Sequence, residues 1–290
     1  MLNTLHQRYR LDAVTLAGGC AMNSVANGKV LQQTPFKNIY IQSAAGDAGG
    51  AIGAASVVWQ KLADSAKSRC LMDHAFWGPS FDNAAIHALL MDKAGEWQAE
   101  GCTMERIEDE TLLCQRTAQA VADAKVVGWF QGRMEWGPRA LGNRSIVCDP
   151  RRADMKDILN LKIKRRESFR PFAPSILREA VSEWFEVDDD VPFMMKVYPI
   201  REEKRASIPA VTHVDGSGRL QTVYAHTNSR YYKLIREFEL LTGVPIVLNT
   251  SFNENEPVVC TPEEALNCFL RTKMDVLVLN DFILVRELDS

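Results

Sequence analysis

The stretch from residue 126 to residue 174 constrains the fold most, because it joins two apolar segments through a long loop rich in glycine and arginine. Residues 126–130 and 146–148 predict two buried strands. Between them the sequence reads QGRMEWGPRALGNRS, and basic residues continue as far as Arg170. The whole chain has net charge −3, so its positive charge is concentrated here. Glycines free backbone N–H groups and arginines contact phosphate with two donors, so the stretch predicts binding of a phosphate-rich ligand.

Side chains that suit phosphate oxygens gather in this loop and after it. Arginine makes bidentate contacts, lysine offers a point charge, and asparagine and serine add neutral polarity. The alternative is a basic surface that faces only solvent. Against it, the arginines alternate with Trp136, Phe172 and other apolar residues that favour burial. The candidate ligand-binding residues are Arg139, Arg144, Lys164, Arg170, Arg219, Asn249 and Ser251.

Residues 1–66 contain two units in which a short strand, a glycine turn and a helix follow one another. Strands are predicted at 13–17 and 38–42, and helices at 22–33 and 51–62. Such turns approach nucleotides closely and helix N-termini attract anions, although a mere tight connection is an equal alternative for the first turn. Asp47, between glycines, is either a helix cap or a ligand to a metal or a nucleotide hydroxyl.

Two strands and two helices are too small a sheet to stand alone. We therefore expect residues 1–66 to pack on the later domain, or to need an upstream part that is missing or belongs to another chain.

The later residues predict an α+β domain with a mixed sheet. Residues 67–109 are less regular and are interpreted as a connector, with a helix at 83–95. Helices are expected at 111–125, at 229–241 and from Pro262, which follows a capping threonine. A strand is expected at 245–249. Hairpins are expected where 211–214 meets 220–225 and where 275–279 meets 282–285.

Composition and motifs argue against several classes of protein. The 290 residues are 46% hydrophobic and 24% charged, as in globular proteins. We expect a cytoplasmic protein, because there is no secretory signal, no run of 18 apolar residues, and seven scattered cysteines without a CxxC motif. The mild net charge disfavours general nucleic-acid binding. No Ser–His–Asp or Cys–His arrangement can be assembled, so the candidate residues predict charge stabilisation rather than a nucleophile.

Five segments occur in the order GGCAMN, AAGDAGGAIGAA, GRMEWGPRALGNRSIVCDPR, KIKRRESFRPFAPS and LNTSFNENEPVV. Together they resemble the O-carbamoyltransferases of nodulation-factor and antibiotic biosynthesis (the NodU/CmcH/TobZ type). The resemblance implies an α/β part with an actin/Hsp70-like (ASKHA) ATPase fold that holds iron, followed by an α+β YrdC-like domain. In the YrdC-like domain ATP, with Mg²⁺, and carbamoyl phosphate would give carbamoyl-adenylate and pyrophosphate. The ATPase-like part would then transfer the carbamoyl group to a hydroxyl of a small-molecule acceptor.

The resemblance also assigns roles to individual residues. It implies that Arg139, Lys164 and Arg170 act in catalysis and bind carbamoyl phosphate and ATP together with Arg219, Asn249 and Ser251. It implies that Gly18, Gly19, Asn23 and Gly46 hold the adenylate, and that Asp47 binds the metal.

One feature of the family is missing: the chain has no HxxxH histidine pair for the metal. We therefore expect the C-terminal portion of such an enzyme, with iron only in the complete one. Its parts would be the end of the transfer domain (1–66), a connector (67–109) and the YrdC-like domain (110–290). An N-terminal half or companion chain would complete it. The alternatives are a tRNA-binding YrdC-like module and a non-catalytic remnant.

Overall fold

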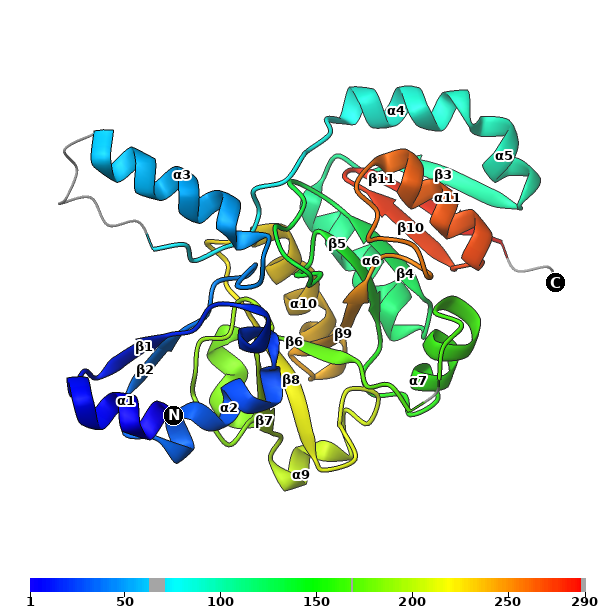
Figure 1. Ribbon diagram of the computed structural model, residues 1–290. Coiled ribbons are helices and arrows are strands. Elements are labelled where there is room, and N and C mark those ends of the chain that lie inside the picture. Colours follow the sequence, from blue (N-terminus) through cyan, green and yellow to red (C-terminus); the bar gives the residue numbers. More distant parts are fainter. Residues whose placement is uncertain (63–70, 168, 288–290) are drawn as a thin grey trace.

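Figure 1 shows the computed structural model of the chain, which describes residues 1–62, 71–167 and 169–287. A small α/β unit at the N-terminus lies beside a larger domain built on a nine-stranded sheet. The boundary predicted at residues 66 and 67 lies outside the described residues.

The N-terminal unit contains both of the predicted strand–glycine–helix units. Its strands pair in parallel, with Ala13 opposite Asn38. The two glycine turns touch, because the Gly18 N–H donates to the Ala45 carbonyl at 2.7 Å. The elements are α1 (Leu2–Tyr9), β1 (Ala13–Thr15), η1 (Gly19–Met22), α2 (Ser24–Gln33), β2 (Asn38–Tyr40) and α3 (Gly49–Leu62).

The large sheet is mixed, as predicted, with the strand order β3-β11-β10-β4-β5-β9-β6-β8-β7. The pairs β10–β4 and β6–β8 are parallel and the other neighbours are antiparallel. The closing hairpin of β10 and β11 is confirmed. The strands are β3 (Cys102–Arg106), β4 (Val127–Phe130), β5 (Arg144–Cys148), β6 (Ala173–Leu177), β7 (Lys196–Pro199), β8 (Ser217–Val223), β9 (Ile246–Ser251), β10 (Val276–Leu279) and β11 (Phe282–Arg286).

Helices cover this sheet and bury its apolar side chains. The longer ones are α4 (Asn83–Asp92), α5 (Ala94–Ala99), α6 (Glu110–Ala122), α10 (Ser229–Thr242) and α11 (Pro262–Thr272). Helices α6 and α10 pack on each other and on the central strands, while α11 packs on β10 and β4. The predicted cap of α11 is confirmed, since Thr261 and Glu264 form a capping box. Short helical segments are α7 (Met155–Asp157), η2 (Ile158–Ile163), η3 (Arg178–Ala180), α8 (Val181–Trp184) and α9 (Glu202–Arg205).

The stretch interpreted as a connector contributes directly to the large domain. Strand β3 pairs antiparallel with β11, with Cys102 opposite Arg286. Helix α4 packs on α11, and the Asn280 side chain donates to the Phe81 carbonyl at 2.8 Å. The large domain therefore begins before Glu110, because β3 forms an edge of its sheet and pairs with β11.

The hairpin predicted around Asp215 and Gly216 is wrong. The strand predicted at 220–225 corresponds to β8, but β8 pairs with β7 and β6. Residues 211–216 form a turn instead of a strand. The Asp215 carboxylate accepts hydrogen bonds from the backbone N–H and the hydroxyl of Ser217 at 3.0 and 2.6 Å. Asp215 thus caps the start of β8, and Gly216 supplies the left-handed backbone that the turn needs.

The N-terminal unit packs on the later domain, as the first of our two expectations stated. The Asn27 side chain donates to the carbonyls of Ala21 and Met195 at 2.7 and 3.0 Å, which ties α2 to the segment before β7. At Gly28 the backbones approach so closely that a Cβ atom would lie 2.0 Å from the Val197 carbonyl oxygen. Only glycine fits at this contact.

Candidate functional site

A single buried carboxylate organises the loop between β4 and β5. One oxygen of Glu135 accepts hydrogen bonds from the backbone N–H groups of Leu141, Asn143 and Arg144 at 2.7, 2.8 and 3.3 Å. Hydrogen bonds to a charged, buried acceptor are stronger than neutral ones. Glu135 therefore fixes the position of the loop that carries Arg139.

Arg139, on this loop, and Arg219, on β8, form the centre of the candidate site. Within the described ranges, the buried Nε atom of each lacks a hydrogen-bond partner. Burial lowers the pKa of Arg139. Burial and the neighbouring charge of Arg139 lower the pKa of Arg219 to about 10. Two partly buried guanidinium groups that repel each other make a site that an anion would stabilise.

Amide and hydroxyl groups of three adjacent strands hold the backbone next to Arg139. Asn249, on β9, donates to the Ala140 carbonyl at 3.0 Å and to Gln221 at 2.8 Å. Gln221, on β8, donates to the Leu141 carbonyl at 2.9 Å and accepts from the Ser175 hydroxyl of β6. Gln221 lies two residues after Arg219, on the same face of β8. The strands thus present both arginines beside a buried polar row.

The side-chain oxygen of Asn249, Oδ1, is an acceptor without a partner among the described groups. The donors of this side chain are already committed, which fixes the orientation of its amide. The site therefore combines two cationic donors, Arg139 and Arg219, with one neutral acceptor, Asn249. Such groups suit a ligand that carries both an anionic group and an N–H.

Lys164 was predicted to contact the ligand, and the structure places it against the turn after β9. Its Nζ donates to the carbonyl oxygens of Ser251 and Asn253 and to Oδ1 of Asn253, the last at 2.6 Å. Burial lowers the pKa of Lys164 to about 7. Its three N–H donors are all engaged, so Lys164 and Ser251 support the turn in this conformation.

Arg144 was predicted to bind phosphate, but the structure gives it another role. Its buried guanidinium donates to the carbonyls of Gln131 and Asn143 at 2.9 and 2.8 Å. It also stacks on the Phe130 ring at 3.5 Å. Its terminal nitrogens therefore hold the two ends of the loop together, while its Nε, like those of Arg139 and Arg219, lacks a partner among the described residues.

Arg170 lies at the surface and pairs with Glu167 at 3.1 Å. The structure thus brings Arg139, Arg219 and Asn249 together and places Arg170 at a solvent-exposed ion pair.

Most of the basic residues around the loop are already neutralised or bound to carbonyls. Arg133 donates to the carbonyls of Gly78 and Trp77 at 3.0 and 2.9 Å. Arg151 pairs with Asp149 at 2.6 Å, and Arg165 pairs with Glu254 at 2.9 Å. The basic residues of this stretch therefore do not form a continuous surface of unpaired cations. Arg139 and Arg219 differ from them, because neither forms an ion pair with a carboxylate among the described residues.

The second glycine turn of the N-terminal unit and the arginine-bearing loop line one cavity of about 660 Å³. The Ser43 hydroxyl donates to the Trp136 carbonyl at 2.8 Å. A Cβ atom at Gly137, whose φ is +132°, would lie 2.6 Å from the Ser43 carbonyl oxygen. Gly46 and Asp47 lie at this cavity, so the two units meet where the sequence placed candidate residues of both.

The other predicted residues of the first turn have structural roles in this conformation. Gly18 joins the two glycine turns, and Gly19 begins η1. The Asn23 side chain caps α2, because its oxygen accepts from the Ala26 N–H at 3.1 Å.

Asp47 is exposed, and the described residues contain no group of three His, Cys, Asp or Glu side chains that could hold a metal ion. The residues present therefore do not fit the iron that the resemblance implies.

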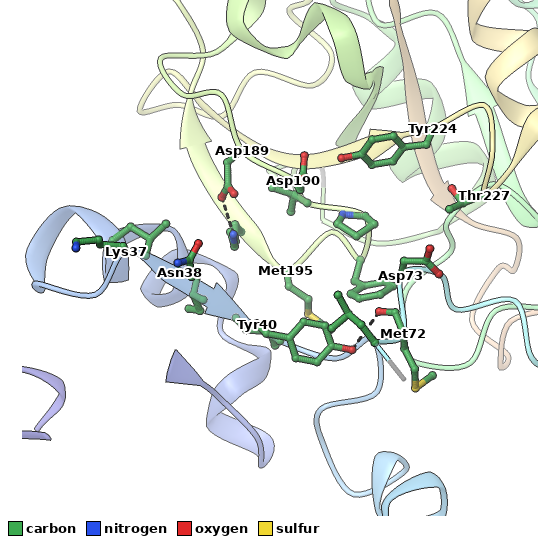
Figure 2. Close-up of a pocket in the computed structure, with 18 of the residues that line it drawn as sticks. Lys37, Asn38, Tyr40, Met72, Asp73, Asp189, Asp190, Met195, Tyr224 and Thr227 are labelled. Atoms are coloured by element: carbon green, nitrogen blue, oxygen red, sulfur yellow. Dashed lines mark hydrogen bonds and ion pairs between the residues drawn. The ribbon is translucent and has the colours of Figure 1, made fainter. Parts of the chain in front are cut away.

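A second cavity, of about 570 Å³, lies between β2 and the loop before β7 (Figure 2). Aromatic and methionine side chains line it together with acids. The Asp189 carboxylate accepts from Lys196 at 2.5 Å, and Arg178 pairs with Asp190. These two acids are already neutralised, so the cavity offers aromatic surface more than free charge.

Three residues that matter to the site escaped the prediction: Glu135, Ser175 and Gln221. Each had a signal in the sequence. Ser175 is a polar residue inside the apolar strand segment APSIL, Gln221 alternates with apolar Leu220 and Val223 in the segment RLQTV, and Glu135 is an isolated acid in a basic loop. Buried polar residues of this kind need hydrogen-bond partners, which often belong to a site.

In the described part of the chain no helix combines the length and the hydropathy of a membrane span. The fold is thus that of an α+β protein, and its candidate site holds two partly buried arginines whose Nε atoms lack partners among the described residues. The family model described as carbamoyltransferase C-terminus matches residues 118–286, and the model described as carbamoyltransferase N-terminus matches residues 1–56. The chain belongs to the carbamoyltransferase family, which confirms the resemblance.

The chain is similar to proteins of about twice its length. It is 47% identical over 308 residues to the uncharacterized protein sll1178 of Synechocystis, covering 98% of this chain and 49% of that protein. It is 45% identical over 285 residues to the nodulation protein NolNO of Sinorhizobium fredii, covering 97% and 41%. Among solved structures it is similar to Sua5 of P. abyssi complexed with L-threonine, with TM-score 0.44 and 13% identity over 61% of this chain and 48% of that one. The chain spans about half the length of the curated relatives it matches.

Proposed function

We propose that the chain is the carbamoyl-activating portion of an O-carbamoyltransferase. In this proposal the large domain is YrdC-like and binds carbamoyl phosphate and ATP, with Mg²⁺, at Arg139 and Arg219. The N-terminal unit is the end of an ASKHA transfer domain. The observation that carries the proposal is the pair of partly buried arginines whose Nε atoms lack partners in the described part of the structure.

The chemistry of carbamoyl phosphate matches three groups of the site that lack partners among the described residues: the guanidinium Nε atoms of Arg139 and Arg219 and the side-chain oxygen of Asn249. Its phosphate oxygens satisfy the two guanidinium groups, and its amide N–H donates to the free oxygen of Asn249. This arrangement supplies no nucleophilic side chain, and the reaction needs none. Water converts carbamoyl phosphate to carbamate and phosphate, and a carbamate oxygen then attacks the α-phosphorus of ATP. The products are carbamoyl-adenylate and pyrophosphate.

Each residue then acts by position and charge. Arg139 and Arg219 bind phosphoryl oxygens and stabilise the negative charge that shifts between them. Glu135 and Gln221 hold the loop so that the arginines need no rearrangement. Lys164 and Ser251 keep the turn after β9 in place. Transfer to a hydroxyl of a small-molecule acceptor is the step of the complete enzyme.

Two other functions were open from the sequence. A tRNA-binding module would need a continuous row of free cations along a phosphate backbone. Arg133, Arg151 and Arg165 are instead bound within the protein, which argues against it. A non-catalytic remnant would have no reason to keep two arginines unpaired, since burying an unpaired charge destabilises a fold.

The test is ATP–pyrophosphate exchange that depends on carbamoyl phosphate, measured on the chain alone. We expect exchange by the wild type and a loss of at least about a hundredfold in Arg139→Ala and Arg219→Ala. The matched control is Arg152→Ala, because Arg152 is a basic residue of the same stretch that is exposed and paired with Asp154. The proposal is wrong if the folded wild type shows no exchange, or if the control loses as much activity as the site variants.

A further inference from the structure

A partly buried histidine just before β8 uses only one side of its ring. The Nδ1 atom of His213 lies 3.2 Å from the hydroxyl oxygen of Ser217. The other ring nitrogen, Nε2, is buried and has no hydrogen-bond partner among the described residues. A buried polar atom of this kind destabilises a fold unless something pairs with it, so Nε2 is suited to a ligand.

The hydrogen bonds around Ser217 decide which nitrogen of the neutral ring carries the proton. The Ser217 hydroxyl donates its single hydrogen to the Asp215 carboxylate at 2.6 Å. Its oxygen therefore accepts from His213, which places the proton of the neutral ring on Nδ1. These three residues are not a nucleophilic triad, because the serine gives its hydrogen bond to the aspartate. They leave Nε2 with a lone pair that accepts a hydrogen bond or a proton.

The histidine belongs to the same face of the sheet as the candidate site. Side chains two residues apart on a strand lie on one face, about 7 Å from each other. On β8 this face carries Ser217, Arg219 and Gln221, and Gln221 holds the loop of Arg139 through the hydrogen bond described above. Because Ser217 binds His213, the ring lies at the end of this polar face, next to Arg219.

The surroundings of His213 favour its neutral form. Burial lowers the pKa of His213, and the opposite effect of the Asp215 carboxylate is itself opposed by the charges of Arg219 and Lys156. The ring is therefore neutral at pH 7 and adds no further cation for phosphate. A neutral ring with a free lone pair suits an O–H donor. In the proposed reaction, the reactant that must lose a proton is water.

We propose that His213 is the general base for the water that attacks carbamoyl phosphate. This inference rests on the proposed function and gives its first step a residue. The water oxygen forms a bond to phosphorus, and the bond between phosphorus and the bridging oxygen breaks. Carbamate leaves with the electron pair of that bond. Nε2 takes one proton of the water, so that hydrogen phosphate forms, and the imidazolium then releases this proton to solvent. Arg139 and Arg219 offset the charge on the phosphoryl oxygens.

The experiment measures the two steps of the reaction separately on the full chain. Phosphate release from carbamoyl phosphate, above the spontaneous background, reports the first step. ATP–pyrophosphate exchange supported by added ammonium carbamate reports the second step, because carbamate bypasses the attack of water. We expect His213→Asn to slow phosphate release by at least about a hundredfold. Its exchange with carbamate and its dissociation constant for carbamoyl phosphate should stay at the wild-type values, because asparagine keeps a side-chain donor for Ser217 and removes only the base.

The pH dependence separates a base from a histidine that only supports the fold. The wild-type rate of phosphate release should fall below about pH 6.5, because Nε2 then becomes protonated. The residual rate of His213→Asn should lack this loss in acid. The matched control is His226→Asn, because His226 is an exposed histidine whose ring lies against Tyr224. That control should leave phosphate release unchanged.

The possible results separate this inference from the proposed function. If His213→Asn releases phosphate at the wild-type rate, or keeps the wild-type loss in acid, the role of His213 is overturned and the proposed function stands. Equal losses of phosphate release and of exchange with carbamate also overturn it, because His213 then supports the fold or the binding of ATP. If the wild type shows no exchange with carbamoyl phosphate or with carbamate, the proposed function fails, and the role of His213 fails with it.

Discussion

Replacing Arg219 with methionine should stabilise the free protein while abolishing its response to phosphate. Methionine keeps the length of the aliphatic stem and removes the charge. Burial and Arg139 lower the pKa of Arg219 to about 10. The folded state therefore binds this proton less tightly than the unfolded chain does. At every pH below about 10 the charge destabilises the fold, and the replacement removes that penalty.

The magnitude follows from the size of the shift. A lowering of the arginine pKa to about 10 corresponds to about 3 kcal/mol, at 1.36 kcal/mol for each pKa unit. Arg219 is not fully buried, and the surrounding solvent screens part of this penalty. We therefore expect Arg219→Met to raise the free energy of unfolding at pH 7 by about 1–3 kcal/mol.

The assay is urea unfolding with and without inorganic phosphate or carbamoyl phosphate. The wild type should gain stability with either anion, and Arg219→Met should lose that gain. The matched control is Arg178→Met, because Arg178 is a partly buried arginine that pairs with Asp188 and Asp190. That replacement should destabilise the protein. If Arg219→Met destabilises it equally, or still responds to phosphate, then Arg219 is not an unpaired anion ligand.

Three further predictions test the supports of the site and the contact between the units. Glu135→Ala should lower the free energy of unfolding by about 3 kcal/mol, because three buried N–H groups lose their acceptor, whereas Glu135→Gln keeps an acceptor and should lose about 1 kcal/mol; equal urea midpoints for the two variants would contradict this. The lowered pKa of Lys164 predicts that wild-type stability rises from about pH 7 to about pH 10.5, since the unfolded lysine still binds its proton in this range, and that Lys164→Met removes this rise. Parallel pH profiles of the two proteins would show that Lys164 stays charged. Gly28→Ala should lose about 2–3 kcal/mol, because the added Cβ would lie 2.0 Å from the Val197 carbonyl oxygen. Its control, Gly53→Ala, has open space around it in α3 and should gain about 0.5–1 kcal/mol in the same urea titration.

Local sequence signals predicted most of the helices and strands because their causes are local. Helix α11 begins at Pro262 after a capping threonine, and the structure shows that cap. The closing hairpin around Asn280 also formed as predicted, since its turn residues and apolar flanks are adjacent in the sequence. The hairpin around Asp215 did not form. Asp-Gly marks a turn, but the strands that meet after the turn depend on pairing with distant β6 and β7.

Residue types identified the candidates for the site, but not which of them are available to a ligand. The sequence treated Arg139 and Arg144 alike, because both are arginines in one loop. In the fold, carbonyl groups of the loop accept hydrogen bonds from the terminal nitrogens of Arg144, whereas the charge of Arg139 helps to lower the pKa of Arg219. Hydrogen-bond partners come from segments far apart in sequence, so only the packed structure distinguishes a bound arginine from a free one.

The sequence by itself determined the family, the order of the elements and the concentration of positive charge between the two central strands. It did so because motifs, hydrophobic periodicity and capping depend on neighbouring residues. The tertiary structure alone decided that the charge of Arg139 acts on Arg219, that Glu135 holds the loop that carries Arg139 and that α3 buries none of its side chains in the described structure. Those facts depend on which strands pair and which faces are covered, and strand pairing and burial are properties of the whole fold.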